Sequence, residues 1–191
     1  MSAANLAIDP RRAALLIIDV QQRLVTAMHQ KDVPALERSI AILCELARRF
    51  DIPVVVSQQY PKGLGQTIDS VERCLAELGD AVHRFDKVEF SVCDAEGFAP
   101  IYDKLGRDQW IVTGMEAHVC VYQSARGLIA RGATVHVPHE AAISRHESNR
   151  RVGFGLMERA GVVHTSTEVV VFDVLEKAGS DDFKAMSRLV R

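Results

Sequence analysis

Short apolar runs alternate with longer amphipathic stretches along the whole chain. Strands are predicted at residues 14–19, 53–58, 110–114, 133–137 and 162–166, with a weaker candidate at 81–85. Most of these runs are apolar at consecutive positions, as is typical of strands that are covered on both faces. The pattern therefore predicts a buried, mainly parallel sheet.

The stretches between the strands repeat apolar residues at helical spacing. Helices are predicted around residues 36–47, 71–78, 121–129 and 152–160. Alternation of strand and helix favours an α/β fold, here a three-layer αβα sandwich with a mainly parallel six-stranded sheet, Rossmann-like, with right-handed crossovers. The 191 residues contain no linker, repeat or low-complexity segment, so we expect a single domain over residues 1–191.

Composition and charge exclude several classes of partner. Asp and Glu number 25 against 23 Lys and Arg, so the net charge of −2 argues against binding to nucleic acid or to an anionic membrane. The apolar run 13–18 is too short to span a bilayer, and its surroundings do not match a signal peptide. Four cysteines without C-x-x-C spacing fit reduced thiols, so we expect a cytoplasmic protein.

Two charged residues lie at or just after the ends of predicted strands, where ligands bind in open parallel sheets. Asp19 closes the first strand, and a carboxylate buried there needs a partner. It is either a helix cap or turn residue, or a general base. Lys87 follows the weak strand 81–85. It is either a surface lysine paired with a neighbour, or an ammonium that stabilises both Asp19 and a thiolate.

The stretch TGMEAHVCVYQSARG, residues 113–127, places Cys120 where a strand gives way to a helix. The N–H groups and dipole of a helix N-terminus lower a thiol pKa, and the same N–H groups can hold an oxyanion. The alternative is a buried small apolar residue. Cys44 and Cys74 lie in apolar helical stripes and Cys93 lies in a polar loop, so we expect no chemistry from these three.

Metal and nucleotide motifs are absent from the sequence. The seven histidines form no H-x-H or H-E-x-x-H pattern, so a zinc site is not supported. There is no G-x-G-x-x-G or P-loop sequence. We therefore expect no metal and no cofactor. His118, two residues before Cys120, either pairs with a thiolate or faces solvent.

The order of Asp19, Lys87 and Cys120 at three strand ends resembles the isochorismatase-like cysteine hydrolases. The resemblance covers most of the chain and is carried by LLIIDVQ, TGMEAHVCVYQSA and RGATVHVPHEAAISR. Three further stretches resemble the branch of animal isochorismatase domain-containing proteins: QQYPKGLGQT, KVEFSV and TSTEVVVFDVLEKAGSDDFKAM. Any one of these motifs is weak, but together and in this order they are specific.

The resemblance implies a set of roles. Cys120 corresponds to the nucleophile, Asp19 to the base and Lys87 to the group that orients the pair. It further implies a cis peptide bond between Met115 and Glu116, and an oxyanion hole made by the N–H groups of Glu116 and Cys120. The implied reaction is attack on an amide-type carbonyl of a small molecule, followed by hydrolysis of the thioester. Members of the family commonly assemble, so we expect a homo-oligomer, a dimer or larger.

Two departures from the family bear on the substrate. Nicotinamidase relatives carry a metal-binding D-x-H motif after the second strand, where this chain reads SQQYPKG. Relatives that cleave the vinyl ether of isochorismate lack the nucleophilic cysteine, which this chain keeps. Metal-independent cleavage of an amide-type bond is therefore the better interpretation than either of those activities.

The irregular loops 59–69 and 87–100 contain Tyr60 and Phe90, which either wall a small substrate pocket or pack the loops together. Arg145 is expected to bind backbone carbonyls or a neighbouring subunit rather than substrate. Two other functions stay open. The chain could be a non-enzymatic interaction or scaffold protein that retains a hydrolase active-site shell. It could also be a thiol redox sensor in which Cys93 resolves a Cys120 sulfenate.

Overall fold

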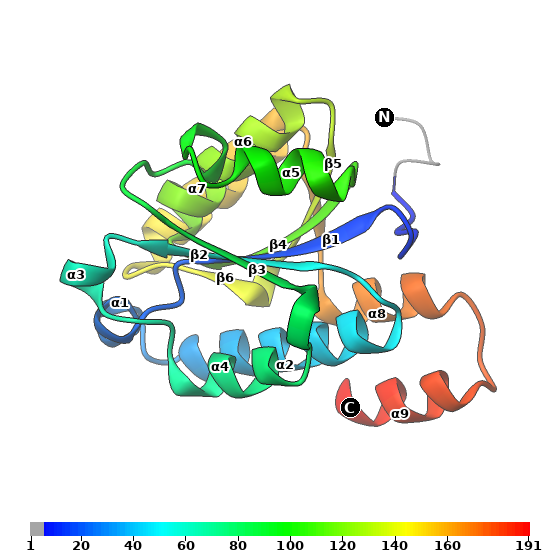
Figure 1. The fold of residues 1–191 in the computed structure, drawn as a ribbon. Coiled ribbons are helices and arrows are strands. Elements are labelled where there is room, and N and C mark those ends of the chain that lie inside the picture. Colours follow the sequence, from blue (N-terminus) through cyan, green and yellow to red (C-terminus); the bar gives the residue numbers. More distant parts are fainter. Residues whose placement is uncertain (1–5) are drawn as a thin grey trace.

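A computed structural model describes residues 6–191, which form a seven-stranded sheet between two layers of helices (Figure 1). The strands are β1 Ala13–Ile18, β2 Val54–Gln59, β3 Val82–Lys87, β4 Gln109–Met115, β5 Thr134–Pro138, β6 Ala142–Ile143 and β7 Val163–Thr165. Their order is β3-β2-β1-β4-β5-β7, with β6 paired to the end of β4 and each strand pair parallel. The predicted α/β class is confirmed.

The seventh strand is the difference from the prediction of six. β6 has only two residues, which pair with Gly114 and Met115. A two-residue run has no periodicity, so the sequence pattern cannot reveal it. The other six strands match the predicted ones to within two residues at their ends.

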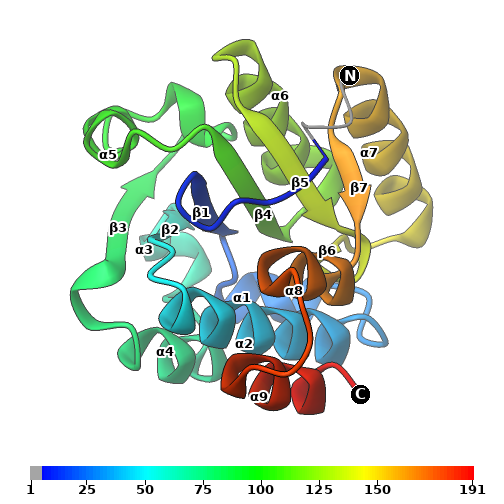
Figure 2. The same ribbon diagram turned by 90° about the vertical axis from the view of Figure 1, so that its right-hand side faces the viewer.

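Helices cover both faces of the sheet, as Figure 2 shows. One layer consists of α2 Val33–Arg49, α4 Asp69–Ala76, α8 Thr167–Leu175 and α9 Asp181–Leu189. The other consists of α5 Ala99–Leu105, α6 Tyr122–Ala130 and α7 Glu147–Ala160. Successive residues of β1 contribute alternately to the two apolar cores between the sheet and these layers. All six residues of β1 are buried, which explains its uninterrupted apolar run.

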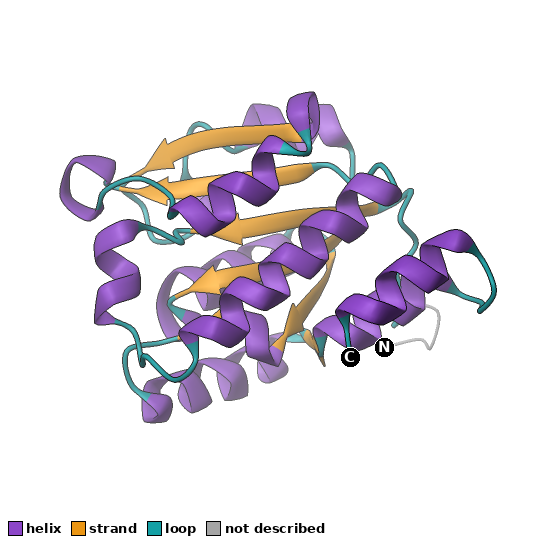
Figure 3. Ribbon diagram, turned by 90° about the horizontal axis from the view of Figure 1, so that it is seen from below, coloured by secondary structure: helices purple, strands orange, loops and turns teal. Residues whose placement is uncertain are grey.

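The long strands run in the same direction, so their carboxyl ends lie at one edge of the sheet (Figure 3). The short helices α1 Gln22–Ala27 and α3 Pro61–Leu64 follow β1 and β2 at this edge. Within residues 6–191, no helix combines the length and the apolar character that a membrane crossing needs.

Gly114 lets β4 approach β1 closely at this edge. Its φ angle is 125°, and a Cβ atom there would lie 2.1 Å from the carbonyl oxygen of Ile18. Only glycine fits such a position without displacing the backbone. Asp19, which follows β1, and Met115, the last residue of β4, are thereby brought close together.

Candidate active site

Asp19 and Lys87 form a buried ion pair at the carboxyl edge of the sheet. Asp19 directly follows β1 and adopts a left-handed φ of 55°, while Lys87 is the last residue of β3. The Lys87 Nζ donates to Oδ2 of Asp19 at 2.7 Å, and both side chains are 0% exposed. Because β2 lies between β1 and β3, the lysine reaches across the end of β2 to the carboxylate. The structure therefore brings together two residues that the sequence singled out separately.

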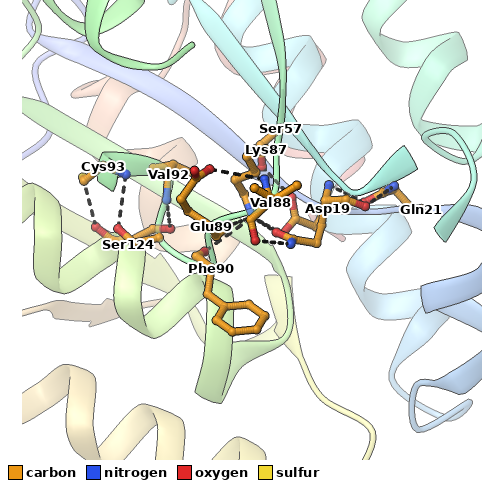
Figure 4. Close-up of polar contacts among 12 residues, drawn as sticks. Asp19, Gln21, Ser57, Lys87, Val88, Glu89, Phe90, Val92, Cys93 and Ser124 are labelled. Carbon is orange, nitrogen blue, oxygen red and sulfur yellow. Dashed lines mark hydrogen bonds and ion pairs between the residues drawn. The ribbon is translucent and has the colours of Figure 1, made fainter. Parts of the chain in front are cut away.

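Ser57 on β2 holds the second carboxylate oxygen. Its hydroxyl donates to Oδ1 of Asp19 at 2.7 Å (Figure 4). Burial raises the pKa of Asp19 above its usual range, although Lys87, Ser57 and Cys120 all act to lower it. The carboxyl group is thus fixed in position and binds a proton more readily than an exposed aspartate, as suits a general base.

The Lys87 ammonium is surrounded by acceptors from its own chain. Besides Asp19, it donates to Oε1 of Gln59 at 2.6 Å. It also donates to the backbone oxygens of Glu89 and Phe90 at 3.1 and 3.4 Å (Figure 4). An ammonium has three N–H donors, and four acceptors face them here. The Lys87 ammonium therefore holds Asp19 and the loop after β3 together, and all three of its N–H groups have acceptors within the chain.

Two glutamines tie this arrangement together. The side chain of Gln21 accepts from the Gln59 N–H at 2.7 Å and donates to the Gln59 carbonyl at 3.0 Å. The Gln59 Nε2 in turn donates to the Val88 carbonyl at 2.8 Å. Gln21, Ser57 and Gln59 cannot be singled out from the sequence, because uncharged polar residues at strand ends carry no pattern that distinguishes them from ordinary turn residues.

Cys120 lies on a turn that connects β4 to α6. The Met115–Glu116 peptide bond is cis, and residues Ala117–Val121 form a single π-helical turn that continues directly into α6. Cys120 is 6% exposed. Its thiol and the Asp19 carboxylate each shift the pKa of the other, so the two groups lie near one another. All three residues of the predicted triad therefore meet at the same edge of the sheet.

The ionisation of Cys120 differs from the expectation. Burial raises the pKa of the thiol to about 12, and the negative charge of Asp19 adds to this effect while Lys87 opposes it. The prediction that the helix N-terminus lowers this pKa toward the thiolate is therefore wrong. Burial and the neighbouring Asp19 carboxylate raise this pKa more than Lys87 lowers it. The resting residue is a neutral thiol, and a nucleophilic attack requires a base to remove its proton.

The residues flanking Cys120 are held by the segment after β6. The Glu116 carboxylate accepts from the backbone N–H and the Nε of Arg145 at 3.0 and 3.1 Å. Arg145 thus binds a carboxylate and not the expected backbone carbonyls, while its predicted contact with a neighbouring subunit stays a prediction. The Nδ1 of His118 lies 3.1 Å from the Ser144 hydroxyl, so this imidazole pairs with that segment and not with a thiolate. These contacts fix the start of the turn that carries Cys120.

An open groove of about 750 Å³ lies beside the ion pair. Its lining residues are Tyr60, Pro61, Lys62, Asp86, Lys87, Val88, Glu89, Glu96 and Gly97. Tyr60 is among them, whereas the ring of Phe90 is not; the Phe90 carbonyl faces Lys87 instead. Asp19 and Cys120 do not line the groove, which meets the buried site at Lys87. Among residues 6–191, no three His, Cys, Asp or Glu side chains come together as a metal site would require.

A family model and curated relatives of this chain all point to the same protein family. The isochorismatase domain model matches residues 13–169. A secreted isochorismatase effector of Phytophthora sojae is 30% identical over 183 residues, covering 95% of this chain and 86% of that protein. Isochorismatase domain-containing protein 1 of Danio rerio is 30% identical over 185 residues; 96% of this chain aligns with 62% of that longer protein.

Solved structures share the fold. The MAR1 ribonuclease of Caenorhabditis elegans superposes with a TM-score of 0.87 at 32% identity, covering 96% of this chain and 92% of that one. The YcaC protein of Escherichia coli, described as an octameric hydrolase of unknown specificity, has a TM-score of 0.80 at 22% identity, with 90% and 83% covered. At that lower identity the likeness concerns the fold alone.

Proposed function

The chain belongs to the isochorismatase family, and from this premise we propose that it is a metal-independent cysteine hydrolase. Its reaction is cleavage of an amide-type C–N bond, or a related carbonyl bond, in a small molecule. The observation that carries the proposal is the buried ion pair of Asp19 and Lys87, with the Cys120 thiol near enough to the carboxylate for each group to shift the pKa of the other. Base, counter-charge and nucleophile are then supplied by the chain itself.

The first half of the reaction forms a thioester. Asp19 takes the Cys120 proton as the sulfur attacks the carbonyl carbon, which avoids a free thiolate in a buried site. The N–H groups of Glu116 and Cys120 hold the oxyanion that develops on the carbonyl oxygen. Asp19 then passes its proton to the leaving nitrogen as the C–N bond breaks.

The second half releases the acid. Asp19, again ionised beside Lys87, takes a proton from a water molecule that attacks the thioester carbon. The C–S bond breaks, and the sulfur recovers a proton from Asp19. Lys87 keeps the carboxylate oriented through both halves, because its ammonium is bound on three sides by Asp19, Gln59 and the loop after β3. No step consumes a cofactor.

Assembly and location complete the proposal. We expect a homo-oligomer, a dimer or larger, and the octameric E. coli protein of the same fold supports this expectation. A cytoplasmic location remains a prediction, and one relative is a secreted effector. Size-exclusion chromatography with light scattering measures the oligomeric state. Fractionation of the source cells shows the cellular location.

Three other functions receive less support. The nematode relative is named a ribonuclease, but the groove beside Lys87 carries three carboxylates against two lysines, which disfavours RNA. A redox sensor needs Cys93 as a resolving thiolate, whereas burial raises the pKa of Cys93 to about 11. A scaffold protein has no need of a buried Asp–Lys pair beside a cysteine.

A panel of small amides, carbamates and ureido acids tests the proposal directly. We expect at least one compound to be hydrolysed by the wild-type protein, with release of ammonia or an amine. Cys120→Ala should abolish this turnover, whereas Cys74→Ala, in the opposite helix layer, should retain it. Turnover by Cys120→Ala at the wild-type rate would rule the mechanism out.

A further inference from the structure

The charged side chains around Cys120 are paired with one another. The ionisable groups that act on its thiol are the carboxylates of Asp19 and Glu116 and the ammonium of Lys87. Glu116 is only 7% exposed and keeps its own partner, Arg145. Each of the two nearby cations, Lys87 and Arg145, is therefore already engaged by one of these carboxylates.

Lys87 is the cation best placed to bind an anionic substrate, and its hydrogen bonds leave no room for one. Its contacts with Asp19 and Gln59, at 2.7 and 2.6 Å, are short, and two backbone carbonyls complete its surroundings. A substrate carboxylate would have to displace one of these acceptors. Displacing Asp19 would leave that buried carboxylate without its counter-charge, which is costly.

The groove that leads to Lys87 is lined by more negative than positive side chains. Its lining carboxylates belong to Asp86, Glu89 and Glu96, all exposed. Within residues 6–191, none of these three carboxylates forms an ion pair with a lysine, arginine or histidine. Lys62 is the one lining cation besides the engaged Lys87. Unpaired carboxylates along a groove repel anions and attract cations at long range.

We propose that the site selects small carbonyl compounds that carry no negative charge, and that neutral or cationic amides react in preference to carboxylates of the same shape. This inference rests on the proposed hydrolase function and narrows its substrate class. Carboxamides, carbamates and amides with a protonated amine fit the site. Ureido acids and other carboxylate-bearing amides do not.

Competing alkylation of Cys120 tests the selectivity without a known substrate. Iodoacetamide and iodoacetate have nearly the same size and differ by one negative charge. The native protein is treated with each reagent, and peptide mass spectrometry gives the modification rate of Cys120. Dividing the ratio of the two rates by the same ratio for N-acetylcysteine removes the intrinsic difference between the reagents.

We expect this normalised ratio to favour iodoacetamide at Cys120 by about tenfold or more at low salt. The preference should fall toward unity in 1 M NaCl, because salt screens charges outside the buried core. Glu96→Gln, which removes a groove charge, should lower the preference at low salt. Glu77→Gln removes the same charge from the exposed end of α4, in the opposite helix layer, and should leave it unchanged.

The possible results separate the two proposals. A normalised ratio near unity, or one that favours iodoacetate, overturns the charge selectivity and leaves the hydrolase proposal standing. A further result to consider is a preference for iodoacetamide that persists unchanged in salt and in Glu96→Gln. That result likewise overturns the charge selectivity and leaves the hydrolase proposal standing. Failure of both reagents to modify Cys120 in the native wild type and also in Asp19→Asn, where the thiol pKa should be lower, overturns both proposals, because no small carbonyl compound could then reach the thiol.

Discussion

The ammonium of Lys87 lies 2.7 Å from the carboxylate of Asp19, and neither side chain is exposed to solvent. Each charge is tolerable at this depth only because the other is present. The pair therefore ties stability to the candidate chemistry: a change that removes one partner leaves an uncompensated charge in the core.

Replacing Lys87 with methionine should lower the free energy of unfolding by about 3–5 kcal/mol, as is usual when one partner of a buried ion pair is lost. Urea denaturation measures the change. The matched control is Arg84→Met on the same strand, whose ion pair with Glu72 has side chains 45% and 40% exposed. It should cost less than about 1 kcal/mol. If the Asp19→Asn/Lys87→Met double variant cost the sum of the two single changes, the coupling would be absent.

Asp19→Asn should separate thiol reactivity from turnover. Asp19 raises the pKa of Cys120, so removing its charge while Lys87 remains should lower that pKa from about 12. Each unit of decrease gives about tenfold more thiolate at pH 8, and alkylation of Cys120 by iodoacetamide should accelerate accordingly. Turnover of an amide should nevertheless be lost, because the base is gone. An unchanged or slower alkylation would contradict this electrostatic account.

Two glycines of α7 offer a matched test of the turn that carries Cys120. A Cβ atom on Gly153 would lie 2.8 Å from the carbonyl of Ala117 and the Cα of His118, whereas nothing lies within 4 Å of one on Gly155. Gly153→Ala should therefore destabilise the protein by about 1–3 kcal/mol and reduce activity by displacing the turn. Gly155→Ala should stabilise it by up to about 1 kcal/mol with activity retained. Equal effects of the two changes on activity would show that α7 does not position Cys120.

His136 on β5 makes stability depend on pH. Burial lowers the pKa of its imidazole to about 4. Between this value and the ordinary 6.5 the unfolded chain binds a proton that the folded chain does not, so acidification through this window favours unfolding. From pH 6.5 to 4.5 we expect this residue to remove about 2 kcal/mol of stability. Urea unfolding at both pH values should show a smaller loss in His136→Leu; an identical loss would assign the effect to other groups.

The sequence predicts the positions of Asp19, Lys87 and Cys120 because of a general property of parallel sheets. Each follows a run of residues with a recognisable strand pattern, and the carboxyl ends of parallel strands meet at one edge. The fold class follows from the same alternation of runs. The family resemblance adds chemical roles to these three positions, which spacing alone does not provide.

Other features depend on packing that no local pattern records. The pKa of Cys120 is raised by burial and by Asp19, which lies 101 positions earlier in the sequence. The local sequence around Cys120 reveals neither cause. Ser57 and Gln59 gain their roles only when β2 lies between β1 and β3. Phe90 contacts Lys87 through its backbone carbonyl. A prediction from sequence relies on the type of side chain, and this contact does not depend on the side chain.

The central claim is that Cys120 forms a covalent acyl intermediate, and a burst experiment with p-nitrophenyl acetate tests it most directly. This neutral activated ester should release about one equivalent of nitrophenol per chain before the steady state, with the acetyl group found on Cys120 by peptide mass spectrometry. Cys120→Ala should show neither the burst nor the acetylated peptide. An acetyl group that instead resides on another residue, or a burst of equal size in Cys120→Ala, would contradict the account.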